Sequence, residues 1–183
     1  ILYRTNTQSR ALEEAMVKRH LPYKIFGSIS FYNRKEIKTL LAYFRLVINH
    51  YDEESLRRVI NFPMRGIGDT TVARMAAVAQ ESRVLLWDVV EHPENFYTGL
   101  NGPTMARLRD FAALINGFSV QLTTKDAYEL GMQICTKTGF AQALNENIEE
   151  KERVDHVTEL FNAIQSFVGR EPENILNEET GEM

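Results

Sequence analysis

Cysteine is nearly missing from this sequence, which holds a single one, Cys135, among 183 residues. One thiol cannot build an internal disulfide framework, so the sequence favours a reducing compartment and we expect a cytoplasmic protein. Only four histidines accompany this cysteine, and they are scattered, which argues against a structural zinc site. Long hydrophobic runs are also missing, so we expect no membrane-spanning segment and no secretory signal.

The common catalytic motifs are missing as well. The sequence has no Gly-x-Ser-x-Gly elbow, no His-Glu-x-x-His zinc motif and no Gly-x-x-x-x-Gly-Lys-Ser/Thr phosphate loop. Cys135 stands among apolar neighbours and is predicted to be a core thiol rather than a nucleophile. The acidic runs at 13–14 and 52–54 are predicted to be solvated helix charges. These residues therefore offer sites for anions without a catalytic centre.

The composition is that of an ordinary folded domain, with 44% hydrophobic and 25% charged residues. The net charge of −4 conceals an asymmetry. Residues 1–75 carry 13 Lys and Arg against 7 Asp and Glu, a net of +6, whereas residues 76–183 carry 8 against 18, a net of −10. A polyanion would therefore meet the front half. The alternative is that each half merely displays solvated charges of a different sign.

Hydrophobic periodicity predicts a fold that is predominantly α with a small α/β portion at the N-terminus. Residues 1–3 and 23–26 have the pattern of strands, with a helix over 8–20 between them. Asn33 and Asp69 are predicted N-caps of two of the later helices. The predicted helices that follow this opening unit cover residues 33–48, 53–61, 70–81, 85–90, 104–122, 126–138 and 150–168.

The strongest break in the pattern lies at 93–103, a stretch containing proline and glycine. It predicts two domains, residues 1–97 and residues 98–183. The sequence begins with Ile1 at the end of an apparent strand, and its last residues are acidic and aperiodic. We therefore expect these residues to be a piece of a larger protein.

Three short segments are candidates for binding nucleotides or nucleic acid. The first is Tyr3-Arg4, directly after the apolar strand end. α/β folds collect ligands at strand ends, and the planar, permanent charge of an arginine suits a transferring phosphoryl group. A tyrosine beside it can stack on a base. The alternative is a buried tyrosine and a surface arginine paired with a carboxylate.

The second segment, Phe31-Tyr32-Asn33-Arg34-Lys35, stands at a predicted helix start. Two aromatic rings followed by two cations form a stacking and phosphate platform for single-stranded nucleic acid. In the alternative, both rings pack above the helix as a hydrophobic staple. The two possibilities are compatible, because one ring can stack on a base while the other packs above the helix.

The third segment runs from residue 63 to residue 71 and contains Arg65-Gly66-Ile67-Gly68, followed by Thr70. Two glycines around one isoleucine predict a tight turn whose backbone N–H groups can hold a phosphate without reading bases. The alternative is an ordinary connection between two helices.

The order of these segments resembles the superfamily 1 DNA helicases of the UvrD/PcrA/Rep group. The resemblance rests on five runs: Ile-Leu-Tyr-Arg-Thr-Asn-Thr-Gln-Ser-Arg-Ala-Leu-Glu-Glu at 1–14, Leu-Pro-Tyr-Lys-Ile-Phe-Gly at 21–27, Phe-Tyr-Asn-Arg-Lys-Glu-Ile-Lys at 31–38, Leu-Ala-Tyr-Phe-Arg-Leu at 41–46 and Asn-Phe-Pro-Met-Arg-Gly-Ile-Gly at 61–68. It implies that residues 1–97 are the N-terminal part of the RecA-like subdomain 2A, and residues 98–183 part of the helical subdomain 2B.

The resemblance also implies roles for the candidate residues. Tyr3 would stack near the adenine of ATP, and Arg4 would reach its γ-phosphate as the catalytic arginine. The turn at 138–140 is a further candidate for a backbone contact. The residues that match DNA-contacting motifs are Phe31, Tyr32, Arg34, Lys35, Arg65, Gly66, Ile67, Gly68 and Thr70.

By this resemblance the larger protein is expected to be an ATP-dependent 3′-to-5′ DNA helicase that uses ATP and Mg²⁺. Its expected partners are single-stranded and junction DNA, with repair or replication proteins. The Walker A loop and the helicase motifs II, V and VI are not found in these residues, so we expect them to hydrolyse no ATP alone. The alternatives are a helicase–nuclease subunit and a non-catalytic module that binds DNA or docks a partner.

Overall fold

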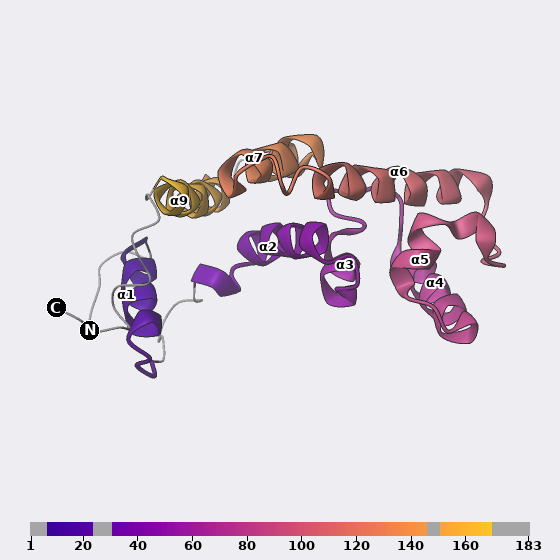
Figure 1. Cartoon of the computed structure of the whole chain (residues 1–183), viewed down its shortest axis with the longest axis horizontal. Coiled ribbons are helices and arrows are strands. Elements are labelled where there is room, and N and C mark those ends of the chain that lie inside the picture. The colour runs from indigo at the N-terminus through magenta and orange to yellow at the C-terminus, as the bar shows by residue number, and fades with distance from the viewer. Residues whose placement is uncertain (1–6, 24–30, 146–150, 170–183) are drawn as a thin grey trace.

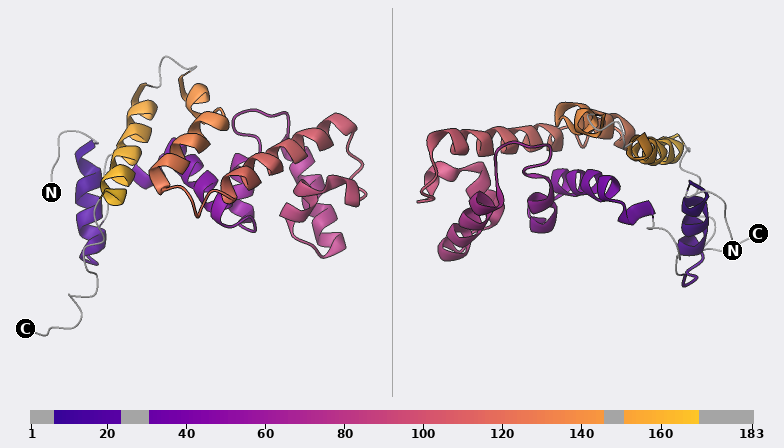
Figure 2. Two further views of the ribbon diagram at one scale, coloured as in Figure 1. Left: turned by 45° about the horizontal axis from the view of Figure 1, so that its top comes forward. Right: turned by 180° about the vertical axis from the view of Figure 1, so that it is seen from behind.

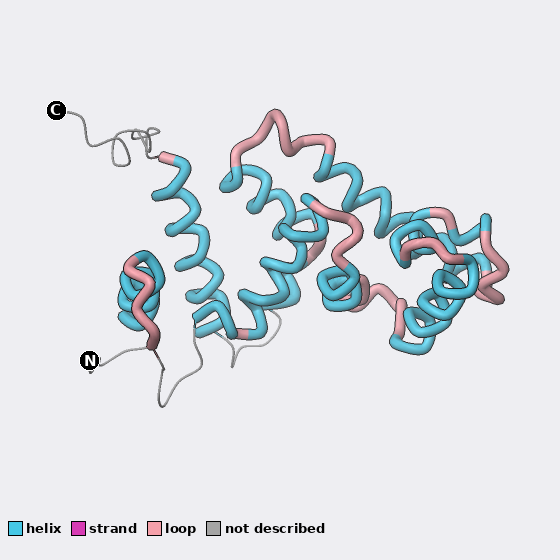
Figure 3. Tube along the Cα trace, turned by 60° about the horizontal axis from the view of Figure 1, so that its bottom comes forward, coloured by secondary structure: helices cyan, strands magenta, loops and turns pink. Residues whose placement is uncertain are grey.

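The computed structural model describes residues 7–23, 31–145 and 151–169. Every regular element in these ranges is a helix, and none of them is a strand (Figure 3). The predominantly α fold is therefore confirmed. Of the predicted α/β portion, the helix is present as α1 (Thr7–Lys18). The predicted strand at 1–3 and all of the strand at 23–26 except Tyr23 lie outside the described residues, and Tyr23 itself is in no strand.

The helices form two facing layers with further helices at both ends (Figure 1). One layer holds α2 (Lys35–Ile48) and α3 (Glu53–Val59). The other holds α6 (Gly102–Ser119), α7 (Ala127–Lys137) and α9 (Lys151–Val168), and α2 packs against all three. At one end α4 (Asp69–Ser82) lies beside α5 (Leu86–Glu91), and α1 stands at the other end (Figure 2).

Helix α2 is the centre of the core because its apolar residues recur every three or four positions. Ile37, Leu40, Tyr43 and Leu46 are fully buried. Each such side chain stabilises the fold by about 1.5–3 kcal/mol relative to exposure. The buried face does not include the last residue of the helix, because Ile48 is 71% exposed.

Side chains cap three of the helices. The carboxylates of Asp52 and Asp126 and the amide oxygen of Asn101 accept from backbone N–H groups at 2.7–3.0 Å in the first turns of α3, α7 and α6. The two predicted caps are wrong. Arg34 rather than Asn33 precedes α2, and Gly68 rather than Asp69 precedes α4, and neither provides a side-chain cap. Three short elements were not predicted, namely η1 (Phe31–Asn33), η2 (Pro93–Asn95) and α8 (Phe140–Asn145).

Close helix packing explains one glycine in α7. A Cβ at Gly131 would lie 2.9 Å from Cε1 of Phe161 in α9 and 3.1 Å from Cζ of Phe44 in α2. The three helices therefore meet at a point where only a hydrogen atom fits. Since α2 and α9 lie on opposite sides of the predicted boundary at 97, packing crosses that boundary. The division into two domains stays a prediction.

Candidate nucleic-acid interface

The two aromatic residues before α2 separate into a buried ring and an exposed ring. Phe31 is fully buried, whereas Tyr32 is 40% exposed, and their rings meet edge to face with centroids 5.2 Å apart. The backbone N–H of Phe31 donates to the buried carboxylate of Glu13 in α1 at 3.5 Å. Glu13 was predicted to be solvated, and that prediction is wrong because its carboxylate anchors η1. Tyr32 is the ring of this pair that a base can reach.

The two cations that follow also separate. Lys35 is exposed, but Arg34 is 7% exposed and its guanidinium carbon lies 5.4 Å from the centre of the Phe31 ring. The Arg34 Nη1 has no hydrogen-bond partner within the described part of the chain. Arg34 thus packs against the Phe31 ring, and Lys35 faces solvent.

The turn between α3 and α4 is organised by the side chain of Asn61. Its Oδ1 accepts from the backbone N–H of Arg65 at 2.9 Å and from that of Ile67 at 3.1 Å. Gly66 adopts a φ of +71°, a left-handed conformation that favours glycine, and Ile67 is fully buried. Two of the N–H groups that the sequence offered to a phosphate are therefore occupied inside the protein.

The side chain of Arg65 is directed inward. Its Nη1 donates to the carbonyls of Val59, Phe62 and Pro63 at 2.8–3.2 Å. Its Nη2 donates to the Tyr43 hydroxyl at 2.9 Å and to the Thr138 carbonyl at 3.1 Å. A guanidinium with these five contacts joins the turn to α2 and to the end of α7. It is not presented to solvent as a phosphate ligand.

The Tyr43 hydroxyl completes this network. It donates to the carbonyl of Phe62 and accepts from Arg65. Burial raises the pKa of Tyr43 above its usual value, and the charge of Arg65 opposes that rise. Tyr43 therefore remains a neutral hydrogen-bonding group.

The turn at 138–140 belongs to the same interior. Thr138 and Phe140 are buried, and the Thr138 hydroxyl donates to the Ile134 carbonyl at 2.6 Å. A Cβ at Gly139, which has a φ of +78°, would lie 3.7 Å from Cγ of Pro63. This turn therefore packs against the 59–68 segment on its interior side.

The first residues of α4 lie at the surface. Gly68 precedes the helix without a side-chain cap, and Asp69 and Thr70 are exposed. The first N–H groups of a helix have no acceptor inside the helix, and the helix dipole adds positive potential there. Arg107 of α6 adds a cation, because its Nη1 lies 3.1 Å from the position that a Cβ of Gly66 would occupy. No local pattern in the sequence indicates Arg107, which is 41 positions from Gly66.

Tyr3 and Arg4 lie outside the described residues. Cys135 is buried, as predicted, and burial raises the pKa of its thiol to about 12. Among the described residues, no group of His, Cys, Asp and Glu is arranged to hold a metal ion. No helix in the same ranges is long and apolar enough to cross a membrane.

The comparisons with known proteins agree with the resemblance. Residues 1–179 match the family described as "UvrD-like helicase C-terminal domain". The chain is 32% identical over 174 residues to the ATP-dependent DNA helicase PcrA of Staphylococcus aureus (strain Mu50 / ATCC 700699), covering 94% of this chain and 24% of that protein. It is 33% identical over 178 residues to DNA helicase II of Haemophilus influenzae, covering 95% of this chain and 24% of that protein. The chain thus spans about a quarter of the length of these relatives, and it belongs to the UvrD-like helicase family, in the UvrD/PcrA group.

Proposed function

We propose that the chain is part of an ATP-driven DNA helicase that translocates 3′ to 5′ along one strand and unwinds the duplex. Its relatives are named as DNA helicases, and PcrA is named as ATP-dependent. The observation that carries the proposal is the surface at the start of α2. There Tyr32 and Lys35 are exposed, whereas Phe31 and Arg34 are buried, with the Arg34 guanidinium carbon 5.4 Å from the centre of the Phe31 ring.

The nine candidate DNA residues divide into two groups under this proposal. Those that face outward would touch the strand directly, by stacking, by charge and through backbone N–H groups: Tyr32, Lys35, Gly66, Gly68 and Thr70. Those directed inward would fix the shape of that surface: Phe31, Arg34, Arg65 and Ile67. An aromatic ring beside cations suits a single strand because every base has a stacking face and every link carries a phosphate.

The nucleotide chemistry belongs to the whole protein, with ATP and Mg²⁺ as its cofactors. Tyr3 would stack on the adenine, and Arg4 would stabilise the negative charge that develops on the γ-phosphoryl group during transfer. These 183 residues contain no phosphate-loop lysine. Alone they would bind DNA without hydrolysing ATP.

Under this proposal the chain also divides at residue 97, with a 2A part before it and a 2B part after it. The protein would act in the cytoplasm on single-stranded and junction DNA, together with repair or replication proteins.

The test is Arg4→Ala in the full-length protein. An arginine that acts on the transition state should lower kcat by roughly 10³-fold on removal, with DNA binding and thermal melting unchanged. Arg4→Lys should restore little, because an ammonium cannot reproduce the planar fork. Tyr3→Ala is the matched comparison, and it should chiefly raise KM for ATP, since stacking acts in ground and transition states alike. A kcat near wild type for Arg4→Ala would refute the role.

A further inference from the structure

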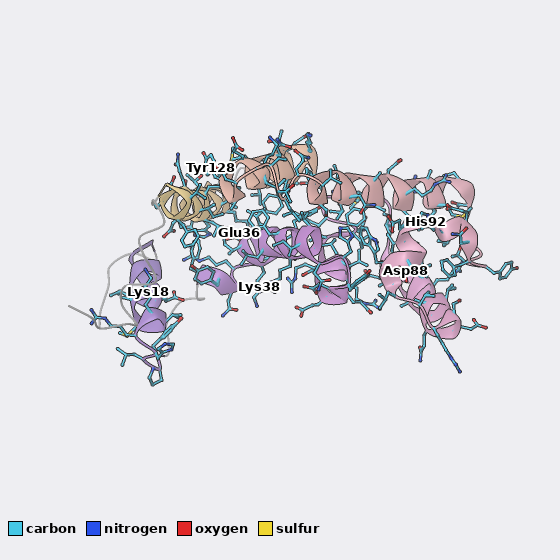
Figure 4. All side chains as sticks on the ribbon, viewed as in Figure 1. Lys18, Glu36, Lys38, Asp88, His92 and Tyr128 are labelled. Atoms are coloured by element: carbon cyan, nitrogen blue, oxygen red, sulfur yellow. The ribbon has the colours of Figure 1, made fainter. Side chains whose placement is uncertain are left out.

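Between α2 and α3, on the side away from α6, α7 and α9, lies a cavity of about 350 Å³. We call it the α2–α3 groove, and its lining includes Tyr32, Lys38, Arg45, Glu54, Ser55 and Arg58. Figure 4 shows Lys38 leaving α2 on the side opposite Glu36. Glu36 faces the other layer, where its carboxylate meets Nδ1 of His156 in α9 at 2.6 Å.

Three cations from two helices converge on this groove, and two of them form no ion pair with any carboxylate of the described residues. Within the described residues, no carboxylate lies within 4.0 Å of the charged nitrogens of Lys38 or Arg45. Arg58 faces Glu54 at 3.8 Å, but the Glu54 side chain is 83% exposed. An exposed pair of this kind contributes little stability and exchanges readily for another anion.

The carboxylate of Asp52, whose charge interacts with that of Arg45, is already engaged. Asp52 accepts from the backbone N–H of Ser55 at 3.0 Å and from its hydroxyl at 2.7 Å. These hydrogen bonds, more than the charge of Arg45, lower the pKa of Asp52, so it stays ionised as the cap of α3. The groove therefore keeps a surplus of positive charge.

We propose that the α2–α3 groove holds the phosphate backbone of a single DNA strand whose base stacks on Tyr32. Lys38, Arg45 and Arg58 bind the phosphates, and arginine forks suit phosphate oxygens. The exposed face of Tyr32 lies at the same groove, and this combination of ring and cations favours a nucleic acid over an acidic peptide. This inference rests on the proposed function and adds three contacts to it.

Fluorescence anisotropy with a labelled oligo(dT) strand, titrated with salt, tests the groove in the 183-residue chain. Lys38→Gln combined with Arg45→Gln should flatten the slope of log K against log salt by about 1.4, at about 0.7 per lost phosphate contact. At about 0.1 M salt, that slope change corresponds to roughly 25-fold weaker binding. Both side chains are exposed, and circular dichroism checks that the helices are unchanged.

The matched control is Arg57→Gln combined with Lys137→Gln, which removes the same charge from exposed positions outside the groove. This control should leave the slope unchanged. Tyr32→Ala should weaken binding by about fivefold or more through lost stacking, and Tyr32→Phe should preserve it.

Three outcomes would contradict the proposal, and they distinguish failure of the DNA surface from failure of the groove. Absence of salt-dependent DNA binding by the unaltered chain would refute the proposed DNA surface and the groove with it. Equal losses from the groove variant and the control would refute the groove alone. A poly-glutamate peptide that displaces the strand as well as unlabelled oligo(dT) does would show that the groove takes acidic peptides, which overturns the assignment to DNA.

Discussion

Replacing Arg65 with methionine separates a structural arginine from a phosphate ligand. The guanidinium donates to the carbonyls of Val59, Phe62, Pro63 and Thr138 and to the Tyr43 hydroxyl. Methionine keeps an unbranched apolar chain at this position and removes all five contacts. The measured change in stability therefore reports mainly on the hydrogen bonds.

The magnitude follows from the number and type of these contacts. A hydrogen bond from a charged donor contributes about 1.5–3 kcal/mol net, and a buried acceptor that loses its partner costs about 1–3 kcal/mol. Water can reach part of this half-buried site, and neighbouring acceptors share one nitrogen, so the losses do not add. We expect Arg65→Met to lower the free energy of unfolding by about 3–5 kcal/mol, which exceeds the effect of most surface substitutions by several-fold.

Urea denaturation followed by circular dichroism measures this loss. The control is Arg57→Met, whose guanidinium makes an exposed pair with Glu53 at 2.6 Å. That pair should contribute no more than about 0.5 kcal/mol. If Arg65→Met unfolds like the control while the salt dependence of DNA binding falls by about 0.7, then Arg65 is a phosphate ligand and the reasoning here is refuted.

Three further outcomes are expected. Gly131→Ala should cost about 1–3 kcal/mol in thermal melts because its Cβ would press on Phe161, whereas Gly117→Ala, with open space around it, should stabilise by about 0.5–1 kcal/mol. Cys135, with a thiol pKa of about 12, should react with a thiol reagent at pH 8 only after urea unfolds the chain. Burial holds the pKa of His50 below 6.5, so the unfolded state binds its proton more readily. Stability should fall as the pH drops through 6.5, and His50→Asn should weaken that dependence.

Helix positions could be predicted from the sequence because the apolar spacing is strong, but helix ends and faces could not. Asn33 has the side chain of a good cap, yet burial of Phe31 holds residues 31–33 in a 3₁₀ turn, and α2 starts later. Tyr43 carries a polar hydroxyl, so its residue type alone does not predict full burial. The structure buries it because Arg65 and Phe62 satisfy its hydroxyl.

In the candidate site, too, the sequence pattern predicts the local backbone but not the direction of a side chain. The pattern of prolines and glycines around Arg65 indicates a turn, but it does not reveal where the guanidinium goes. The groups that direct Arg65 inward include Tyr43 and Thr138, which are 22 and 73 positions away in the sequence. Glu13 was likewise taken for a surface charge because its partner, the N–H of Phe31, lies 18 positions away.

The fold also shows where the excess positive charge of residues 1–75 reaches the surface. Arg34 and Arg65 are directed inward, and Arg57 is paired, so these cations add little to the surface available to a polyanion. Lys38 and Arg45 lie at the face of α2 that turns away from α6, α7 and α9, and no carboxylate of the described residues lies within 4.0 Å of their charged nitrogens. A strand approaching the molecule would therefore meet a surplus of positive charge at this face. This positive charge would attract the phosphates to the α2–α3 face, and Tyr32 would provide a stacking surface for a base once the strand arrives.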